Sequence, residues 1–150
     1  MGNDFLQLGF SVLALVLGAG CEDLLPSVLG IGFPVLLVSA QVLAVRGTPT
    51  TAYAFAVAAG AAEDALSGLA PMTSVGFFLL AAILARRLGT CCRLTSLTYP
   101  CYQLWLAVWT GGLNVFSRIL LAFPVGLLTA AAVGLVLSWA IRWGAIDERG

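Results

Sequence analysis

The chain has 150 residues, of which 61% are hydrophobic and 9% are charged. Soluble domains carry about 25% charged residues, so this composition excludes an ordinary soluble domain and predicts an integral membrane protein. The formal net charge is zero, and no cluster of arginines is large enough to indicate a nucleic-acid partner.

Six apolar runs follow one another along the chain and fill most of it. A helix that crosses the hydrocarbon core needs about 20 residues. Several of these runs are shorter, which is typical of a thin bilayer or of helix ends covered by neighbouring helices. We therefore expect an all-α fold, with a single membrane domain over residues 1–150. The predicted spans are 5–20, 29–45, 51–66, 73–88, 99–114 and 119–143.

The charged residues between the spans divide unequally between the two sides of the membrane. When successive loops are placed alternately on two sides, one side receives Arg46, Arg86, Arg87, Arg93, Arg142 and Arg149. The other side receives Glu22, Asp23, Glu63, Asp64 and a single base, Arg118. Because cytoplasmic loops retain positive charge, the sequence predicts that both termini are cytoplasmic.

Two adjacent acids lie near the end of the third span. Residues 52–62 give only about 11 residues of helix before them, or roughly 16 Å, so Glu63 and Asp64 are expected below the outer headgroups. They either end the span in the outer interface or have a structural or partner-binding role. Buried acids are disfavoured unless they are paired or protonated. Arg118 is therefore predicted to pair with one of them, and Asp64 is the preferred partner.

Small residues recur every four positions along the third span and lead to one of these acids. The stripe consists of Ala52, Ala56, Gly60 and Asp64. Small side chains allow a second helix to approach closely. The Asp64 carboxylate is therefore predicted to point towards a neighbouring helix and not towards lipid.

The fifth span carries a row of aromatic residues at helical spacing, namely Tyr102, Trp105, Trp109 and Phe116. Interfacial anchoring and lipid-facing bulk are favoured for this row over a docking face for a partner helix. Tyr99 and Tyr102 are expected at the inner headgroups, where amphipathic rings gather. Isolated amides are typical of hydrogen bonds between helices, and they occur at Gln41, Gln103 and Asn114.

Nothing in the sequence indicates catalysis, a metal site or another cofactor. Histidine is absent, so the candidate general bases are reduced to the few acids. The four cysteines do not form the spaced pairs of a zinc or redox site. We therefore expect a protein that is not an enzyme.

A recurring pattern covers residues 29–88. The second span ends in Ala44-Val45-Arg46-Gly47, and the alanine-rich third span closes on Gly-x-x-x-Asp-x-x-Ser-Gly, from Gly60 to Gly68. Residues 71–76, with proline and glycine, then lead into another apolar span. This pattern resembles a divergent member of the MreD family, the small rod shape-determining membrane proteins of bacteria.

The resemblance implies a six-helix bundle similar to the substrate-binding membrane subunits of ECF vitamin importers. It also implies a non-catalytic scaffold of lateral cell-wall synthesis in the bacterial cytoplasmic (inner) membrane. Its partners would be a periplasmic, single-span MreC-type protein and cell-wall synthases. The alternative is a substrate-binding subunit of a vitamin-type transporter. The candidate structural or partner-binding residues are Gly60, Glu63, Asp64, Ser67, Gly68, Arg46 and Arg118.

Overall fold

The computed structural model describes residues 2–24, 33–89, 92–110 and 115–142. Within these ranges the chain forms six α-helices and no strand, so the predicted all-α fold is confirmed. The helices are α1 (Gly2–Leu24), α2 (Val35–Arg46), α3 (Pro49–Ser67), α4 (Thr73–Leu88), α5 (Cys92–Thr110) and α6 (Val115–Arg142).

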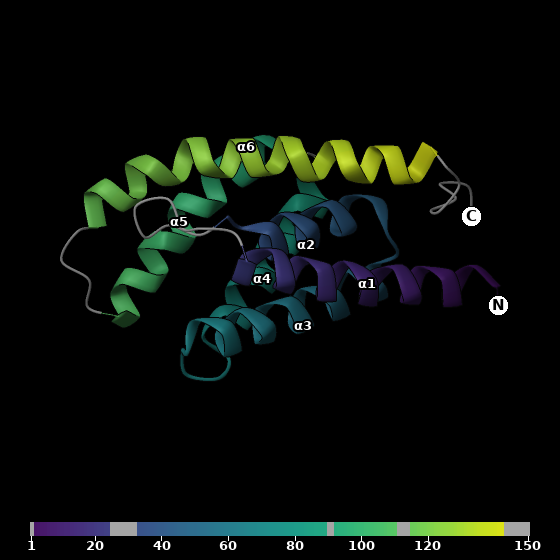
Figure 1. The fold of residues 1–150 in the computed structure, drawn as a ribbon, viewed down its shortest axis with the longest axis horizontal. Coiled ribbons are helices and arrows are strands. Elements are labelled where there is room, and N and C mark those ends of the chain that lie inside the picture. The colour runs from purple at the N-terminus through teal and green to yellow at the C-terminus, as the bar shows by residue number, and fades with distance from the viewer. Residues whose placement is uncertain (1, 25–32, 90–91, 111–114, 143–150) are drawn as a thin grey trace.

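Successive helices run in opposite directions between the two ends of an elongated bundle of six helices (Figure 1). One end, here called the arginine end, holds the start of α1, the last residue of α2 (Arg46), the last turn of α4 (Arg86 and Arg87) and the last residue of α6. The opposite end, here called the acidic end, holds the last turns of α3 with Glu63 and Asp64. Four of the six arginines that the loop alternation grouped on one side, Arg46, Arg86, Arg87 and Arg142, therefore lie at the same end of the bundle.

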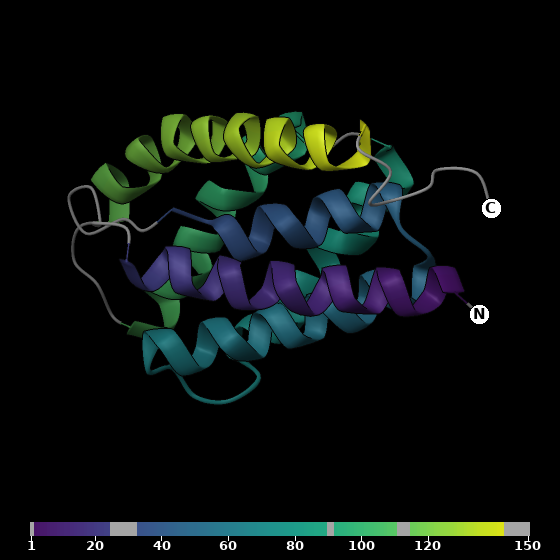
Figure 2. The same cartoon turned by 45° about the vertical axis from the view of Figure 1, so that its right-hand side comes forward.

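Helix α2 lies in the centre of the bundle and is only 12 residues long (Figure 2). It contacts all five other helices, and its residues from Leu36 to Ala44 are all buried. Much of the core around it is alanine, including Ala52, Ala56, Ala59 and Ala82. Small side chains bring the helix axes close together, which explains how one short helix is enclosed on every side.

The bundle has an apolar core with a few polar groups inside it, and it also exposes many large apolar side chains on its surface. Amide, hydroxyl and carboxyl groups are buried at Gln41, Ser74, Thr95 and Asp64. Large apolar side chains are exposed along the outer helices, at Val12, Leu13, Val16 and Leu17 of α1, Leu97, Leu104 and Val108 of α5, and Leu120, Leu127, Leu128, Leu135 and Val136 of α6. Within the described residues one helical segment, Arg118–Val136, is long and apolar enough to cross a membrane, and Ser11–Cys21 and Val35–Arg46 are shorter apolar segments.

The predicted boundaries hold well for some spans and fail for the fifth. The predicted span 73–88 coincides with α4, and 51–66 lies inside α3. Helix α5, however, begins at Cys92 and continues through Pro100, which the sequence had placed near its start. Tyr99 and Tyr102 therefore lie in mid-helix and are each 2% exposed. The prediction that they anchor at the headgroups is wrong, because about two turns of helix precede Tyr99.

Two further differences concern the first two spans. Helix α1 extends through Glu22 and Asp23 to Leu24, so these acids form its last turn and do not follow it. Helix α2 begins at Val35, after Pro34 at its N-cap position. The predicted start of this span, residues 29–32, lies outside the described residues.

Candidate functional site at the closed end of the α3–α4 hairpin

Asp64 of α3 caps the N-terminus of α4. Its side chain is 4% exposed, and its Oδ1 accepts a hydrogen bond of 2.8 Å from the backbone N–H of Ser74. The N-cap residue of α4, Met72, has a left-handed backbone and provides no side-chain cap. A carboxylate is stabilised at this position, because the first N–H groups of a helix are unpaired and carry partial positive charge.

Gly60 allows α3 and α4 to approach closely enough for that cap to form. A Cβ atom built on Gly60 would lie 2.6 Å from the Cα and 2.9 Å from the N of Val75. Both are backbone atoms of α4, so rotating a side chain could not relieve the clash. Ala52 and Ala56 are buried on the same stripe. The predicted stripe, with Asp64 turned towards a neighbouring helix, is confirmed, and that helix is α4.

The remaining residues of the Gly-x-x-x-Asp-x-x-Ser-Gly pattern end α3. Gly68 adopts the left-handed conformation (φ 63°) that favours glycine, and its N–H donates to the carbonyl oxygen of Asp64. The N–H of Leu69 donates to the same carbonyl at 3.0 Å. Ser67 Oγ donates to Glu63 Oε1 at 3.2 Å. The pattern is therefore one structural unit that stops α3, turns the chain and caps α4.

Helix α5 joins this unit through two polar contacts and a ring cluster. Ser74 Oγ lies 2.7 Å from Tyr102 Oη, and Trp105 Nε1 donates to the carbonyl oxygen of Thr73 at 3.0 Å. The Tyr102 ring packs edge-on against Phe78, with 5.6 Å between centroids. The sequence analysis missed the roles of Ser74 and Tyr102. The only signal was the hydroxyl of Tyr102, which needs a hydrogen-bond partner when the ring is buried.

The other aromatic residues of α5 divide between core and surface. Trp105 and Trp109 are exposed and pack against each other, with 5.9 Å between ring centroids. Their exposure agrees with the predicted outward-facing row, whereas Tyr102 is a core residue. The side chain of Phe116 lies outside the described residues.

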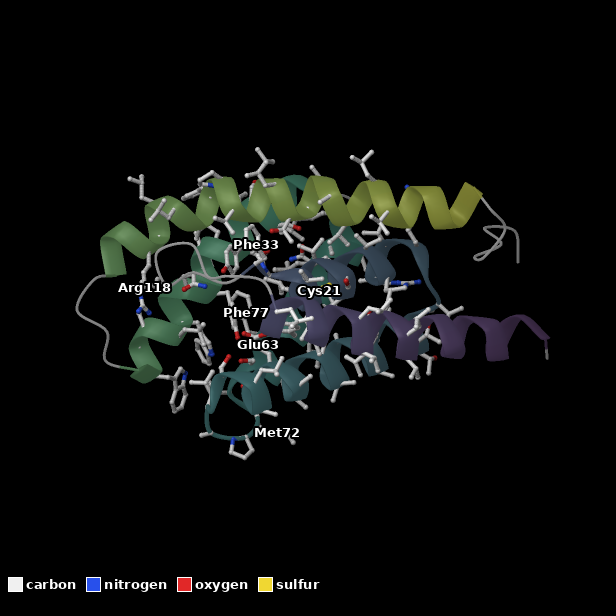
Figure 3. The ribbon with its side chains drawn as sticks, in the orientation of Figure 1. Cys21, Phe33, Glu63, Met72, Phe77 and Arg118 are labelled. Carbon is white, nitrogen blue, oxygen red and sulfur yellow. The ribbon has the colours of Figure 1, made fainter. Side chains whose placement is uncertain are left out.

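The predicted ion pair between Arg118 and an acid of α3 is not formed. Among the described residues, Asp64 Oδ2 is buried without any hydrogen-bond partner, and Oδ1 is bonded to Ser74. Helix α6, which carries Arg118, packs on α5 and α2 and does not contact α3. Figure 3 shows Arg118 near the start of α6, apart from Glu63. Charge complementarity predicted the pair, but helix packing keeps the two groups on different sides of the bundle.

Arg46, the remaining candidate, lies at the arginine end and is not part of this unit. It is the last residue of α2 and is exposed. At that end Arg86 of α4 performs the clearer structural role. Its Nη1 donates to the carbonyl oxygens of Ala44 at 3.2 Å and Gly47 at 3.1 Å. These acceptors lie at the C-terminus of α2, where the helix dipole favours a cation.

A second buried polar cluster joins α2 to α5. Gln41 Nε2 donates to Thr98 Oγ1 at 2.7 Å, and its Oε1 accepts a hydrogen bond from Thr95 Oγ1. Gln41 is completely buried. The predicted role of Gln41 in bonding between helices is confirmed. Gln103 is also buried, and Asn114 lies outside the described residues.

The described residues contain no group of three or more His, Cys, Asp or Glu side chains that could hold a metal ion. Comparisons with protein-family models, with curated protein sequences and with solved structures found no match to this chain.

Proposed function

We propose that this chain is an MreD-type scaffold of the bacterial inner membrane, which binds a periplasmic, single-span MreC-type protein and cell-wall synthases and has no catalytic role. The observation that carries the proposal is that the family-like pattern forms one connected unit. Gly60, Asp64 and Gly68 each have a separate role in closing the α3–α4 hairpin. If the pattern resembled the family only because both are rich in apolar residues, these three residues would not be expected to act together in one turn.

The distribution of polarity supports a membrane location. Soluble proteins leave most polar side chains exposed, whereas this bundle buries Gln41, Thr95 and Asp64 within its apolar core and also exposes leucine and valine on α1, α5 and α6. Acyl chains would cover that apolar surface. Helices α3 and α4, of 19 and 16 residues, are about 28 and 24 Å long, close to the thickness of the hydrocarbon core.

The membrane topology can be tested at two exposed turns at opposite ends of the bundle. We expect Thr48→Cys, between α2 and α3, to be protected from a membrane-impermeant maleimide in intact cells, because this turn follows Arg46 on the cytoplasmic side. Pro71→Cys, between α3 and α4, is expected to react. Both variants are made in a chain whose native cysteines are replaced by serine. Equal labelling of the two positions would refute the alternating topology.

The scaffold function can be tested by co-purification. A tagged form of the chain is expressed with the MreC-type protein of the same bacterium and extracted in a mild detergent. We expect the MreC-type protein to be enriched with the chain, together with cell-wall synthases. An unrelated single-span protein expressed at the same level is the control. Equal recovery of the control and the MreC-type protein would refute the scaffold function.

The transport alternative rests on the buried hydroxyl and amide groups of α2 and α5, which could face a small molecule. Both polar atoms of the Gln41 amide are, however, already bonded to Thr98 and Thr95. Binding sites for small molecules keep such groups free to orient the ligand, so this arrangement favours the scaffold. Co-purification of the chain with ATPase subunits and a bound vitamin would establish the alternative.

A further inference from the structure

We propose that Asp64 Oδ2 is the acceptor for a cationic side chain, a guanidinium or an ammonium, from the single-span partner at the acidic end of the bundle. This inference rests on the proposed scaffold function and identifies the chemistry of the contact. It concerns the one carboxylate oxygen of Asp64 that is not used in capping α4.

The first observation is that only one of the two side-chain oxygens of Asp64 has a hydrogen-bond partner among the described residues. Oδ1 alone caps α4 through Ser74, while Oδ2 is buried and has no partner among the described residues. An asparagine would supply the same acceptor to Ser74 without burying an unpaired charge. A buried carboxylic acid group is disfavoured as the carboxylate unless it is paired, and is otherwise protonated. The described residues supply no hydrogen-bond donor to Oδ2, and we infer that a partner protein supplies one.

The second observation is that the described residues place no base beside the two acids. Arg118 lies on α6, which does not contact α3. Glu63 is half-buried next to Asp64, and its Oε1 accepts only the neutral hydroxyl of Ser67. The acidic end of α3 therefore presents two carboxylates that a cationic group would complement. A guanidinium suits the site best, because its planar set of N–H donors matches the geometry of a carboxylate.

The third observation is that little side-chain volume separates Asp64 from the surface. Ala61 lies three residues before Asp64 on a neighbouring part of the α3 surface, Gly68 follows the last residue of α3, and both are exposed. A Cβ atom added to Gly68 would meet nothing within 4 Å. A long side chain can therefore approach Asp64 across Ala61 and Gly68, and the contact requires a local shift near Asp64, because Oδ2 is buried in the unbound structure.

Co-purification of the MreC-type partner with variants of this chain tests the contact. We expect Asp64→Asn to reduce recovery of the partner at least tenfold. The isolated variant should unfold at a temperature no lower than the unmodified chain, because the cap on α4 is kept. Ala61→Leu should also reduce recovery at least tenfold by blocking the approach. Ala54→Leu, at another exposed position on α3, is the matched control and should leave recovery unchanged.

Two results would overturn the inference. One is full recovery of the partner with Asp64→Asn, and the other is equal loss with Ala61→Leu and Ala54→Leu. On the partner side, replacing each arginine or lysine near its outer membrane boundary by alanine should identify one base whose loss adds nothing to the loss from Asp64→Asn. If the loss from Asp64→Asn and the loss from the partner substitution add for every base, the inference is also contradicted.

A separate measurement distinguishes failure of this inference from failure of the scaffold function. If the unmodified chain captures no MreC-type protein, the scaffold function fails, and the acceptor is tested alone with n-octylguanidinium chloride. We expect this probe to raise the unfolding temperature of the isolated chain, and not that of Asp64→Asn. The neutral analogue n-octylurea should affect neither. An equal effect of the guanidinium on both proteins would overturn the inference.

Discussion

Replacing Gly60 by alanine is expected to lower the free energy of unfolding by about 1 to 3 kcal/mol, the usual cost of forcing extra volume into a packed contact. The new methyl group would lie 2.6 Å from the Cα of Val75, so α4 would have to move away from α3. That movement would also lengthen the bond between Asp64 and the N–H of Ser74. Thermal unfolding of the purified protein in detergent measures the loss.

Gly76 supplies the matched control for this substitution. It lies within α4, and a Cβ atom added there would meet nothing within 4 Å. Alanine is favoured over glycine in a helix interior by about 1 kcal/mol, so Gly76→Ala should unfold at the same temperature as the unmodified chain or at a higher one. Equal losses from the two substitutions would contradict the close approach at Gly60.

Replacing Gln41 by alanine is expected to cost about 2 to 4 kcal/mol of unfolding free energy, from a cavity and from two buried hydroxyls that lose their hydrogen bonds to the amide. The hydroxyls belong to Thr95 and Thr98. Gln41→Met keeps most of the volume and should isolate the loss of the hydrogen bonds. Thermal unfolding in detergent is again the measurement.

A combined variant separates hydrogen bonding from packing in this cluster. In Gln41→Met with Thr95→Val and Thr98→Val, no polar group of the cluster is left without its partner. Replacing all partners by apolar groups of similar shape is often nearly neutral, so the triple variant should be more stable than Gln41→Met alone. If the three losses simply add, the side chains are not coupled in the way that their distances indicate.

Local signals were sufficient to predict most of the α3–α4 hairpin. Thr48 at the N-cap and Pro49 in the first turn of α3 are typical helix-start residues, and the side chain of Thr48 does accept from the N–H of Thr51. Gly68 and Gly89 end α3 and α4 in the left-handed conformation. Such signals act within a few residues, so the sequence alone carries them. At Pro100 the same kind of reasoning fails, because local rules place a proline at a helix boundary, whereas α5 continues through it.

The partners of Asp64 could be predicted only in part. The four-residue stripe through Gly60 correctly placed the carboxylate against another helix, because helical geometry fixes which residues share a face. Its hydrogen bond to Ser74 depends on the axial position of α4 relative to α3, which no local sequence pattern determines. The incorrect pairing with Arg118 has the same origin. Opposite charges on one side of a membrane do not determine which helices are neighbours.

The enclosed position of α2 has a consequence for the order in which the molecule is made. Gln41 is synthesised early, but its hydrogen-bond partners Thr95 and Thr98 lie 54 and 57 residues later in the chain. Until the ribosome has completed α5, the amide has neither partner, and the 12 residues of α2 are too few to span a bilayer independently. If the chain is inserted in a membrane as proposed, α2 therefore needs either the α3–α4 hairpin or the insertion machinery to cover it while the second half of the bundle is produced.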